Sequence, residues 1–155
     1  MRDYEKKDAM TKEISTMLCA KEYEVAEAVG RLKSEQTRMK SQIAELQQKL
    51  LKFCVAEIPV DEKIVTVFDG SLSGNLPREM MNQLLDKGAV ICAVFAGTDE
   101  EGYRYVIGSR SEDVRSISKT LNSTLEGRGG GKPEMVQGSV KGTEDAVKEI
   151  IARYQ

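Results

Sequence analysis

The chain has 155 residues, which is room for one ordinary domain of about 100–150 residues and an appendage. It carries 23 Lys or Arg, 25 Asp or Glu and no His, so Ser/His/Asp and Cys/His nucleophile pairs and His-based zinc sites are excluded. We therefore expect no catalytic residues, no metal site and no cofactor, and we predict that the chain by itself is not an enzyme.

A helical region opens the chain and is expected to occupy residues 1–56. Residues 1–20 have a short helical pattern, and residues 22–53 carry apolar side chains at alternating spacings of four and three. This apolar seam predicts either a helical hairpin within the chain or a coiled coil with a second chain, and Gln36 would tune its register in either case. The seam comprises Val25, Val29, Leu32, Gln36, Met39, Ile43, Leu46, Leu50 and Phe53, and the predicted dimerisation contacts are Val29, Leu32, Met39, Ile43, Leu46 and Leu50.

The pattern changes after Phe53, and residues 57–155 are expected to form a small globular domain. Short β-branched apolar segments predict strands at 63–68 and 89–97, and a turn then leads into a third strand at 103–108. A fourth strand is expected at 135–140. These strands predict a mixed sheet.

Helices are expected between and after these strands. One ends at Gly88, a second covers residues 111–125 with Val114, Ile117, Ser118, Leu121 and Leu125 inward, and the last is capped by Thr143. The resulting order, β-α-β-β-α-loop-β-α, predicts an α/β or α+β domain in which helices flank the sheet.

The glycine-rich stretch GRGGGKPEMVQGSV, residues 127–140, lies between the second helix and the last strand. Three consecutive glycines between Arg128 and Lys132 favour an open loop whose backbone N–H groups bind an anion. The stretch is not a nucleotide P-loop because Pro133 follows Lys132, and it is not a dinucleotide fingerprint because it follows a helix. The alternative is a turn that serves packing alone.

The charge distribution supports an anionic partner for this stretch. Residues 102–142 carry seven Lys or Arg against four Asp or Glu, a net charge of +3, whereas residues 54–101 carry three against nine, a net charge of −6. A local basic excess suits contact with a phosphate backbone. The predicted nucleic-acid contacts are Arg128, Gly129, Gly130, Gly131, Lys132 and Gln137, extended by Arg115 and Lys119, with Arg110 and Lys141 as weaker candidates. Arg115, Lys119 and Asn122 are expected on the exposed face of the second helix.

The same stretch resembles the signature of the DHHA1 domain at the C-terminus of alanyl-tRNA synthetases and of long-form alanyl-tRNA editing proteins. The matching positions are Gly129, Gly130, Gly131, Lys132, Pro133, Glu134, Met135 and Gln137. Val136 departs from the Ala usual in synthetases, and the Gly138-Ser139-Val140 ending is closer to the editing proteins. The helical region before the domain extends the resemblance over essentially the whole chain.

The resemblance implies a tRNA-binding and dimerisation module that positions alanine tRNA for a separate editing domain, in a piece of a longer protein. Alanine tRNA and a second copy of the chain are the expected partners. The main alternative is an assembly module with a purely structural glycine stretch. A third, a phosphoesterase, would require Asp61, Asp69, Asp99 and Glu134 to gather around metal.

The expected setting is the cytoplasm, without contact to a membrane. Three cysteines, Cys19, Cys54 and Cys92, lie far apart in apolar surroundings, which favours reduced and buried thiols. The chain has no apolar run long enough to span a bilayer and no signal-like N-terminus.

Overall fold

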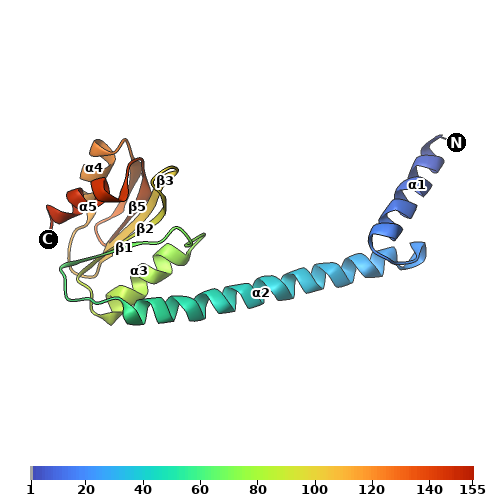
Figure 1. The fold of residues 1–155 in the computed structure, drawn as a ribbon, viewed down its shortest axis with the longest axis horizontal. Helices are drawn as coiled ribbons and strands as arrows, with labels where there is room; N and C mark the ends of the chain where they lie inside the picture. The colour runs from blue at the N-terminus through green and yellow to red at the C-terminus, as the bar shows by residue number, and fades with distance from the viewer. Residues whose placement is uncertain (1) are drawn as a thin grey trace. The chain divides into compact units, whose positions relative to one another are not determined.

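The computed structural model describes residues 2–155, and the chain divides into two compact units between Lys49 and Leu50. Figure 1 shows the helices and strands as a ribbon whose colour runs from blue at the N-terminus to red at the C-terminus. The elements are α1 (Arg2–Met17), a 3-10 turn η1 (Glu22–Glu24), α2 (Val25–Glu57), β1 (Ile64–Phe68), α3 (Leu76–Lys87), β2 (Ile91–Thr98), β3 (Gly102–Ser109), α4 (Arg115–Thr124), β4 (Arg128–Lys132), β5 (Met135–Val140) and α5 (Glu144–Ala152).

In the N-terminal unit, the apolar side chains of α1 and α2 are mostly in contact with solvent. On α1, Tyr4 is 80% exposed and Met17 is 76% exposed, and Ala28 is the buried apolar residue of this part of α2. Val29, Leu32, Met39, Ile43 and Leu46 are all exposed. The helices form as the heptad pattern predicts, and the seam that defines the pattern is open.

In the C-terminal unit, five strands form one mixed sheet in the order β1-β2-β3-β5-β4. β1 pairs with β2 in parallel, and every other pairing is antiparallel. β2 and β3 are central and rich in β-branched and aromatic residues, as strands covered on both faces should be. The predicted α+β domain with a mixed sheet is confirmed.

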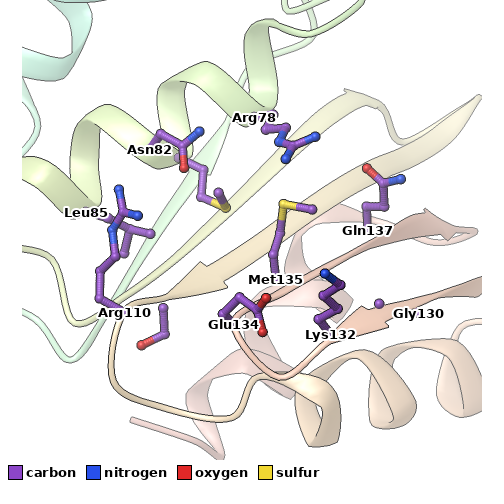
Figure 2. Close-up of a pocket in the computed structure, with 12 residues that line it drawn as sticks. Arg78, Asn82, Leu85, Arg110, Gly130, Lys132, Glu134, Met135 and Gln137 are labelled. Atoms are coloured by element: carbon purple, nitrogen blue, oxygen red, sulfur yellow. The ribbon is translucent and has the colours of Figure 1, made fainter.

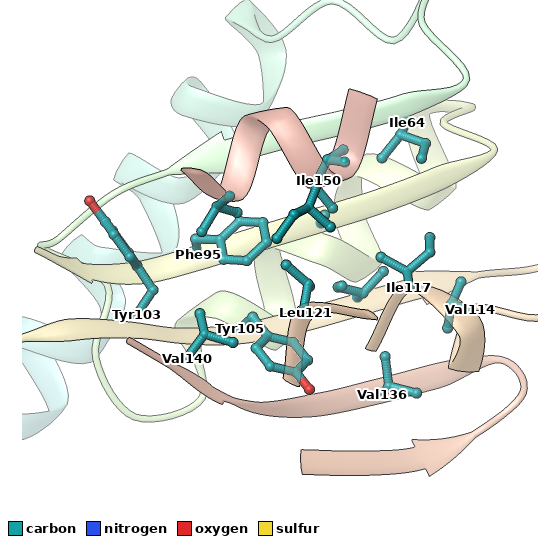
Figure 3. Packing of buried hydrophobic residues seen from close by; sticks show 14 of the residues in the cluster. Ile64, Phe95, Tyr103, Tyr105, Val114, Ile117, Leu121, Val136, Val140 and Ile150 are labelled. Carbon is teal, nitrogen blue, oxygen red and sulfur yellow. The ribbon is translucent and has the colours of Figure 1, made fainter. Parts of the chain in front are cut away.

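Alternating side chains place one apolar core on each face of the sheet. α4 and α5 close one face, where Phe95, Tyr105, Ile117, Leu121 and their neighbours form the larger core shown in Figure 3. α3 and the last turns of α2 close the other face with Met80, Leu84, Leu51, Val55 and their neighbours. The layers of this unit are thus helix, sheet and helix.

The end of α2 is fixed to α3 by one lysine. Lys87 Nζ donates hydrogen bonds to the carbonyl oxygens of Val55, Ala56 and Ile58, at 2.9, 2.7 and 2.6 Å. These are carbonyls that a helix leaves without partners at its C-terminus, where a positive charge is also favoured by the helix dipole. Lys87 therefore caps α2 from the neighbouring helix.

The helix ends follow their sequence signals. Gly88 ends α3 with φ of 122° and donates to the carbonyls of Leu84 and Leu85, and the Thr143 side chain accepts from the Ala146 N–H at the start of α5. Asp99, in the β2–β3 turn, accepts from the Tyr103 hydroxyl and from the Glu144 N–H. The hydrogen bond to Asp99 raises the pKa of Tyr103 to about 12, and the turn is held against α5.

The burial of the cysteines and the start of the second helix were predicted wrongly from the sequence. Cys19 is exposed, whereas Cys54 is half-buried and Cys92 is fully buried, and burial raises the pKa of the Cys92 thiol to about 12. The second helix begins at Arg115 rather than at residue 111, because Ser109 holds the preceding turn by accepting from the N–H groups of Ser111 and Glu112.

None of the described helices is long and apolar enough to cross a membrane.

Candidate nucleic-acid interface

The glycine stretch is a β-strand at the edge of the sheet and not an open loop. Arg128–Lys132 forms β4, which pairs only with β5, and all five of its residues are exposed. A tight turn at Pro133 and Glu134 joins the two strands. Glycine has a low strand propensity, so composition pointed to a loop, whereas pairing with β5 decides the conformation.

Two of the three consecutive glycines are required by packing. A Cβ atom on Gly129 would lie 2.6 Å from both the Tyr105 hydroxyl and the Gly138 Cα, and one on Gly131 would overlap the backbone of Met135 and Val136. Both distances are too short for a real side chain. The backbone of β4 therefore approaches β5 in a way that only glycine allows at these positions.

Gly130 has no such reason to be glycine. An added Cβ would meet nothing within 4 Å, and Gly130 is not among the described residues with positive φ. Glycine in a strand costs roughly 0.5–1 kcal/mol relative to alanine because it loses more conformational freedom. A glycine that the fold does not need, on an exposed strand, is typical of a site where a ligand approaches the backbone.

The register of the sheet sorts the neighbouring side chains by face. Arg128, Gly130 and Lys132 stand opposite Ser139, Gln137 and Met135 on β5, and Met135 belongs to the core under α3. Since side chains alternate along a strand, these residues all point to the α3 side of the sheet. Arg104 on β3, opposite Ser139, joins them.

α3 covers the other strands on this side but leaves β4 and β5 partly open, and a cavity of about 480 Å³ lies beside it. Figure 2 shows Arg78 and Asn82 on α3 on one side of this cavity and Gly130, Lys132 and Gln137 on the other. Arg110, after β3, also lines it, and so does Glu134. Three cations, Arg78, Arg110 and Lys132, therefore line the cavity to which β4 contributes Gly130 and Gly131.

Two further hollows continue along the same face. One of about 390 Å³ shares Gln137 with the first cavity, and one of about 460 Å³ shares Arg104 and Arg128 with the second. The three adjoining hollows form what we call the basic groove. Its basic residues are Arg78, Arg104, Arg110, Arg128, Lys132 and Lys141, and acidic side chains lie only towards its two ends, at Glu134, Glu101 and Glu126.

The structure separates the predicted contact residues into two groups. Arg128, Gly130, Lys132 and Gln137 meet in the basic groove, together with the weaker candidates Arg110 and Lys141. Arg115 and Lys119 lie on α4, which packs on the opposite face of the sheet. Gly129 and Gly131 contribute no side chain to the groove; they let the backbone of β4 run close to that of β5.

Ion pairs occur in both groups. The Arg115 guanidinium donates to both carboxylate oxygens of Asp113, with a shortest distance of 2.6 Å, and this lowers the pKa of Asp113 to about 2. In the groove, Arg110 is paired with Asp86 at 2.7 Å. Arg115 on α4 and Arg110 in the groove therefore each have a carboxylate beside them, whereas no ion pair within residues 2–155 involves Arg78, Arg104, Arg128 or Lys132.

Sequence reasoning missed Arg78 and Arg104 and misplaced Asn122. Arg104 sits at an exposed alternate position between the buried Tyr103 and Tyr105, a signal that strand periodicity could have supplied. Arg78 lies on the exposed face of α3, and nothing in the sequence connects it with β4. Asn122 faces the sheet rather than solvent, because its side chain bonds inside the domain.

A polar cluster of Tyr105, Ser118 and Asn122 supports β4 from below. The buried Tyr105 hydroxyl lies 2.7 Å from the Ser118 hydroxyl and donates to Asn122 Oδ1 at 3.0 Å. Asn122 Nδ2 in turn donates to the carbonyl of Gly129 at 3.3 Å. The cluster holds β4 against α4, so the strand that lines the groove is fixed in position from the opposite face of the sheet.

Comparison with known proteins assigns this unit to a family. A family model described as the DHHA1 domain matches residues 61–155, well over half of the chain. The chain belongs to the DHHA1 domain family. This DHHA1 domain is related to that of alanyl-tRNA synthetases, as the glycine signature predicted.

The relatives with curated names are much longer than this chain. It is 33% identical over 73 residues to the alanine–tRNA ligase of Acholeplasma laidlawii (strain PG-8A), covering 44% of this chain and 9% of that protein. It is 24% identical over 156 residues to the alanine–tRNA ligase of Psychrobacter sp. (strain PRwf-1), covering 93% and 17%. The DHHA1 chain thus spans less than a fifth of either relative.

A solved structure shares the fold. RecJ from Thermus thermophilus, in complex with Mg²⁺, superposes with a TM-score of 0.58 at 16% identity, covering 91% of this chain and 21% of that chain. At 16% identity, this similarity shows that the two chains share a fold and nothing about a shared function. Among residues 2–155, no three His, Cys, Asp or Glu side chains gather as a metal site would require, so the four carboxylates of the phosphoesterase alternative do not form one.

Proposed function

We propose that the DHHA1 unit binds tRNA in the basic groove, with the exposed backbone of β4 as the point of closest approach. Gly130 carries this proposal, because the fold leaves space for a side chain there and the groove is lined by cations. A missing side chain lets a phosphate come within reach of the strand. Arg128 and Lys132 on the same face would neutralise it.

The chemistry of the groove suits the backbone of RNA better than its bases. Structured RNA is held largely through phosphate, 2′-hydroxyl and shape contacts. Guanidinium groups at Arg78, Arg104 and Arg128 can donate to phosphate oxygens as a fork, and the Gln137 amide can contact a 2′-hydroxyl. We therefore expect the groove to recognise the shape of the RNA rather than its base sequence.

The relatives supply the context for this proposal. Proteins that resemble the chain are alanine–tRNA ligases, so alanine tRNA is the expected ligand. We propose that the domain positions this tRNA for an editing or aminoacylation domain that is not in this chain. On this view the chain contributes affinity and placement but no catalysis, and its setting is the cytoplasm.

Binding of alanine tRNA measured by fluorescence anisotropy at about 50 mM and about 200 mM salt tests the proposal. The Gly130→Val, Lys132→Ala double variant should lose the salt-sensitive binding while keeping its thermal midpoint. Gly30→Ala combined with Lys119→Ala is the matched control, since Gly30 also has open space around it and Lys119 lies on the opposite face of the sheet. Equal affinity for the double variant and the control would contradict a role for the groove.

We also propose a second function, assembly of two copies through α2. The specific observation is the open seam: Val29 is 47% exposed, Leu46 is 64% exposed and Phe53 is 72% exposed. Monomeric proteins rarely leave a continuous apolar stripe in water. Light scattering of the wild-type chain and of a Leu46→Glu, Leu50→Glu variant should show a dimer and a monomer, and a monomeric wild type would contradict this second function.

A further inference from the structure

The apolar residues of α2 occupy two positions of a heptad repeat. Val29, Gln36, Ile43 and Leu50 recur every seven residues, and three residues after each of them comes Leu32, Met39, Leu46 and Phe53. These are the a and d positions of a coiled coil, respectively. The seam therefore extends over residues 29–53, with the polar Gln36 at one a position.

The globular unit uses a different side of the same helix. Within that unit, Leu51 is 3% exposed and Val55 is 7% exposed, whereas Leu50 is 63% exposed. In the heptad, Leu51 and Val55 are b and f positions, which point away from the a/d seam. The packing of the last turns of α2 within that unit thus leaves Leu50 and Phe53, the end of the seam, exposed.

The residue types at a and d favour one kind of partner helix. Val29 and Ile43 are β-branched residues at a, and Leu32 and Leu46 are leucines at d. In these layers the combination favours two parallel strands over trimers and tetramers, whereas the remaining a and d residues, Gln36, Leu50, Met39 and Phe53, do not follow that rule. A second copy of α2 would supply the same residues in the same layers.

Gln36 separates the parallel arrangement from the antiparallel one. In a parallel pair in register, Gln36 faces Gln36 of the second copy, and the two amides can donate to each other. In the antiparallel pair that overlaps the whole seam, Gln36 faces Leu46 of the second copy. An amide buried there without a partner costs about 1–3 kcal/mol, and it occurs twice in the dimer.

The flanking charges favour the same arrangement. A parallel pair brings Glu35, at a g position, beside Lys40, at the following e position of the second copy, and it does so twice. The antiparallel pair brings the two copies of Lys40 together. It also offers Glu35 to Lys49, but Lys49 is already paired with Glu45 of its own helix at 2.6 Å.

We propose that two copies of the chain join through α2 as a parallel, in-register, two-stranded coiled coil in which Gln36 pairs with Gln36 of the second copy. The proposal rests on the second proposed function, assembly through the seam, and adds its geometry. The seam overlaps over about 36 Å of helix, from Val29 to Phe53.

Disulfide trapping tests the geometry in a background in which Cys19 and Cys54 are replaced by alanine and the buried Cys92 is kept. Val29→Cys should give a disulfide-linked dimer on mild oxidation, because the parallel pair places both thiols in one layer. In the antiparallel pair the two thiols are about 36 Å apart, far beyond the about 7 Å that a disulfide allows between Cα atoms. Ser34→Cys, at an outward f position, is the control and should remain unlinked.

The outcomes separate this proposal from the function on which it rests. A dimer by light scattering that links at Val29→Cys supports both. A dimer that fails to link there, but links when chains carrying Val29→Cys and Phe53→Cys are mixed, overturns the parallel geometry and leaves assembly intact. A chain that scatters as a monomer overturns both.

A Gln36→Leu variant gives a second readout. Without the amide pair, the register and the number of strands are no longer specified, so its Val29→Cys form should link less completely, and trimers should appear by light scattering. Unchanged linking and an unchanged dimer would show that Gln36 does not set the geometry, contrary to the proposal.

Discussion

The two faces of strands β4 and β5 differ although they share one backbone. On one face, α4 covers the strands and a buried tyrosine hydroxyl touches them; on the other, α3 stops short and leaves the basic groove. Close packing requires glycine at positions 129 and 131, whereas Gly130 lies on the open face with space around it. The three consecutive positions are therefore glycine for different reasons, and substitutions at single positions can test this difference.

Gly129→Val should produce the largest effect. Its side chain would meet the Tyr105 hydroxyl and the backbone of β5, so we expect a loss of about 3 kcal/mol in the free energy of unfolding. Urea denaturation followed by circular dichroism measures this loss. Gly130→Ala in the same assay should lose nothing, and a comparable loss in both variants would erase the distinction between the two faces.

Tyr105→Phe should weaken the covered face by a smaller amount. The ring stays in the core, but Ser118 and Asn122 lose their shared partner, which costs about 1 kcal/mol. The thermal midpoint should fall while the sheet remains intact. A variant as stable as the wild type would mean that the polar cluster does not hold β4 in place.

Arg78→Ala and Arg115→Ala compare the open face with the covered one in binding. Removing a phosphate contact should lower the slope of log affinity against log salt by about 1. We expect this change for Arg78→Ala, on the groove, and an unchanged slope for Arg115→Ala, which is paired with Asp113. The reverse result would move the interface to α4.

The smallest effect concerns the carboxylate beside Arg115. The pKa of Asp113 is lowered to about 2 in the folded state, below the ordinary value of about 3.9, so its contribution to stability is present above pH 4 and is lost as the pH falls towards 2. NMR titration should show this low pKa and, in Arg115→Ala, a return towards the ordinary value. An unshifted Asp113 in the wild type would mean that Arg115 is free to bind other anions.

The sequence predicted most elements of the DHHA1 domain because local signals and burial agree there. β-branched runs became β2 and β3, and Gly88 and Thr143 mark helix ends as expected. β4 was missed because its conformation comes from pairing with β5 and not from its own residues. Likewise, Arg78 joins the groove only through the packing of α3, a long-range contact that periodicity does not encode.

Lys87 makes the junction between α2 and α3 a matter of electrostatics as well as packing. One ammonium group donates all three of its protons to the carbonyls of Val55, Ala56 and Ile58. Acylation would neutralise this side chain and leave it a single N–H donor, so at least two of the three carbonyls would lose their partner. The attachment of the last turns of α2 to α3, the helix beside the groove, therefore depends on a single side-chain nitrogen.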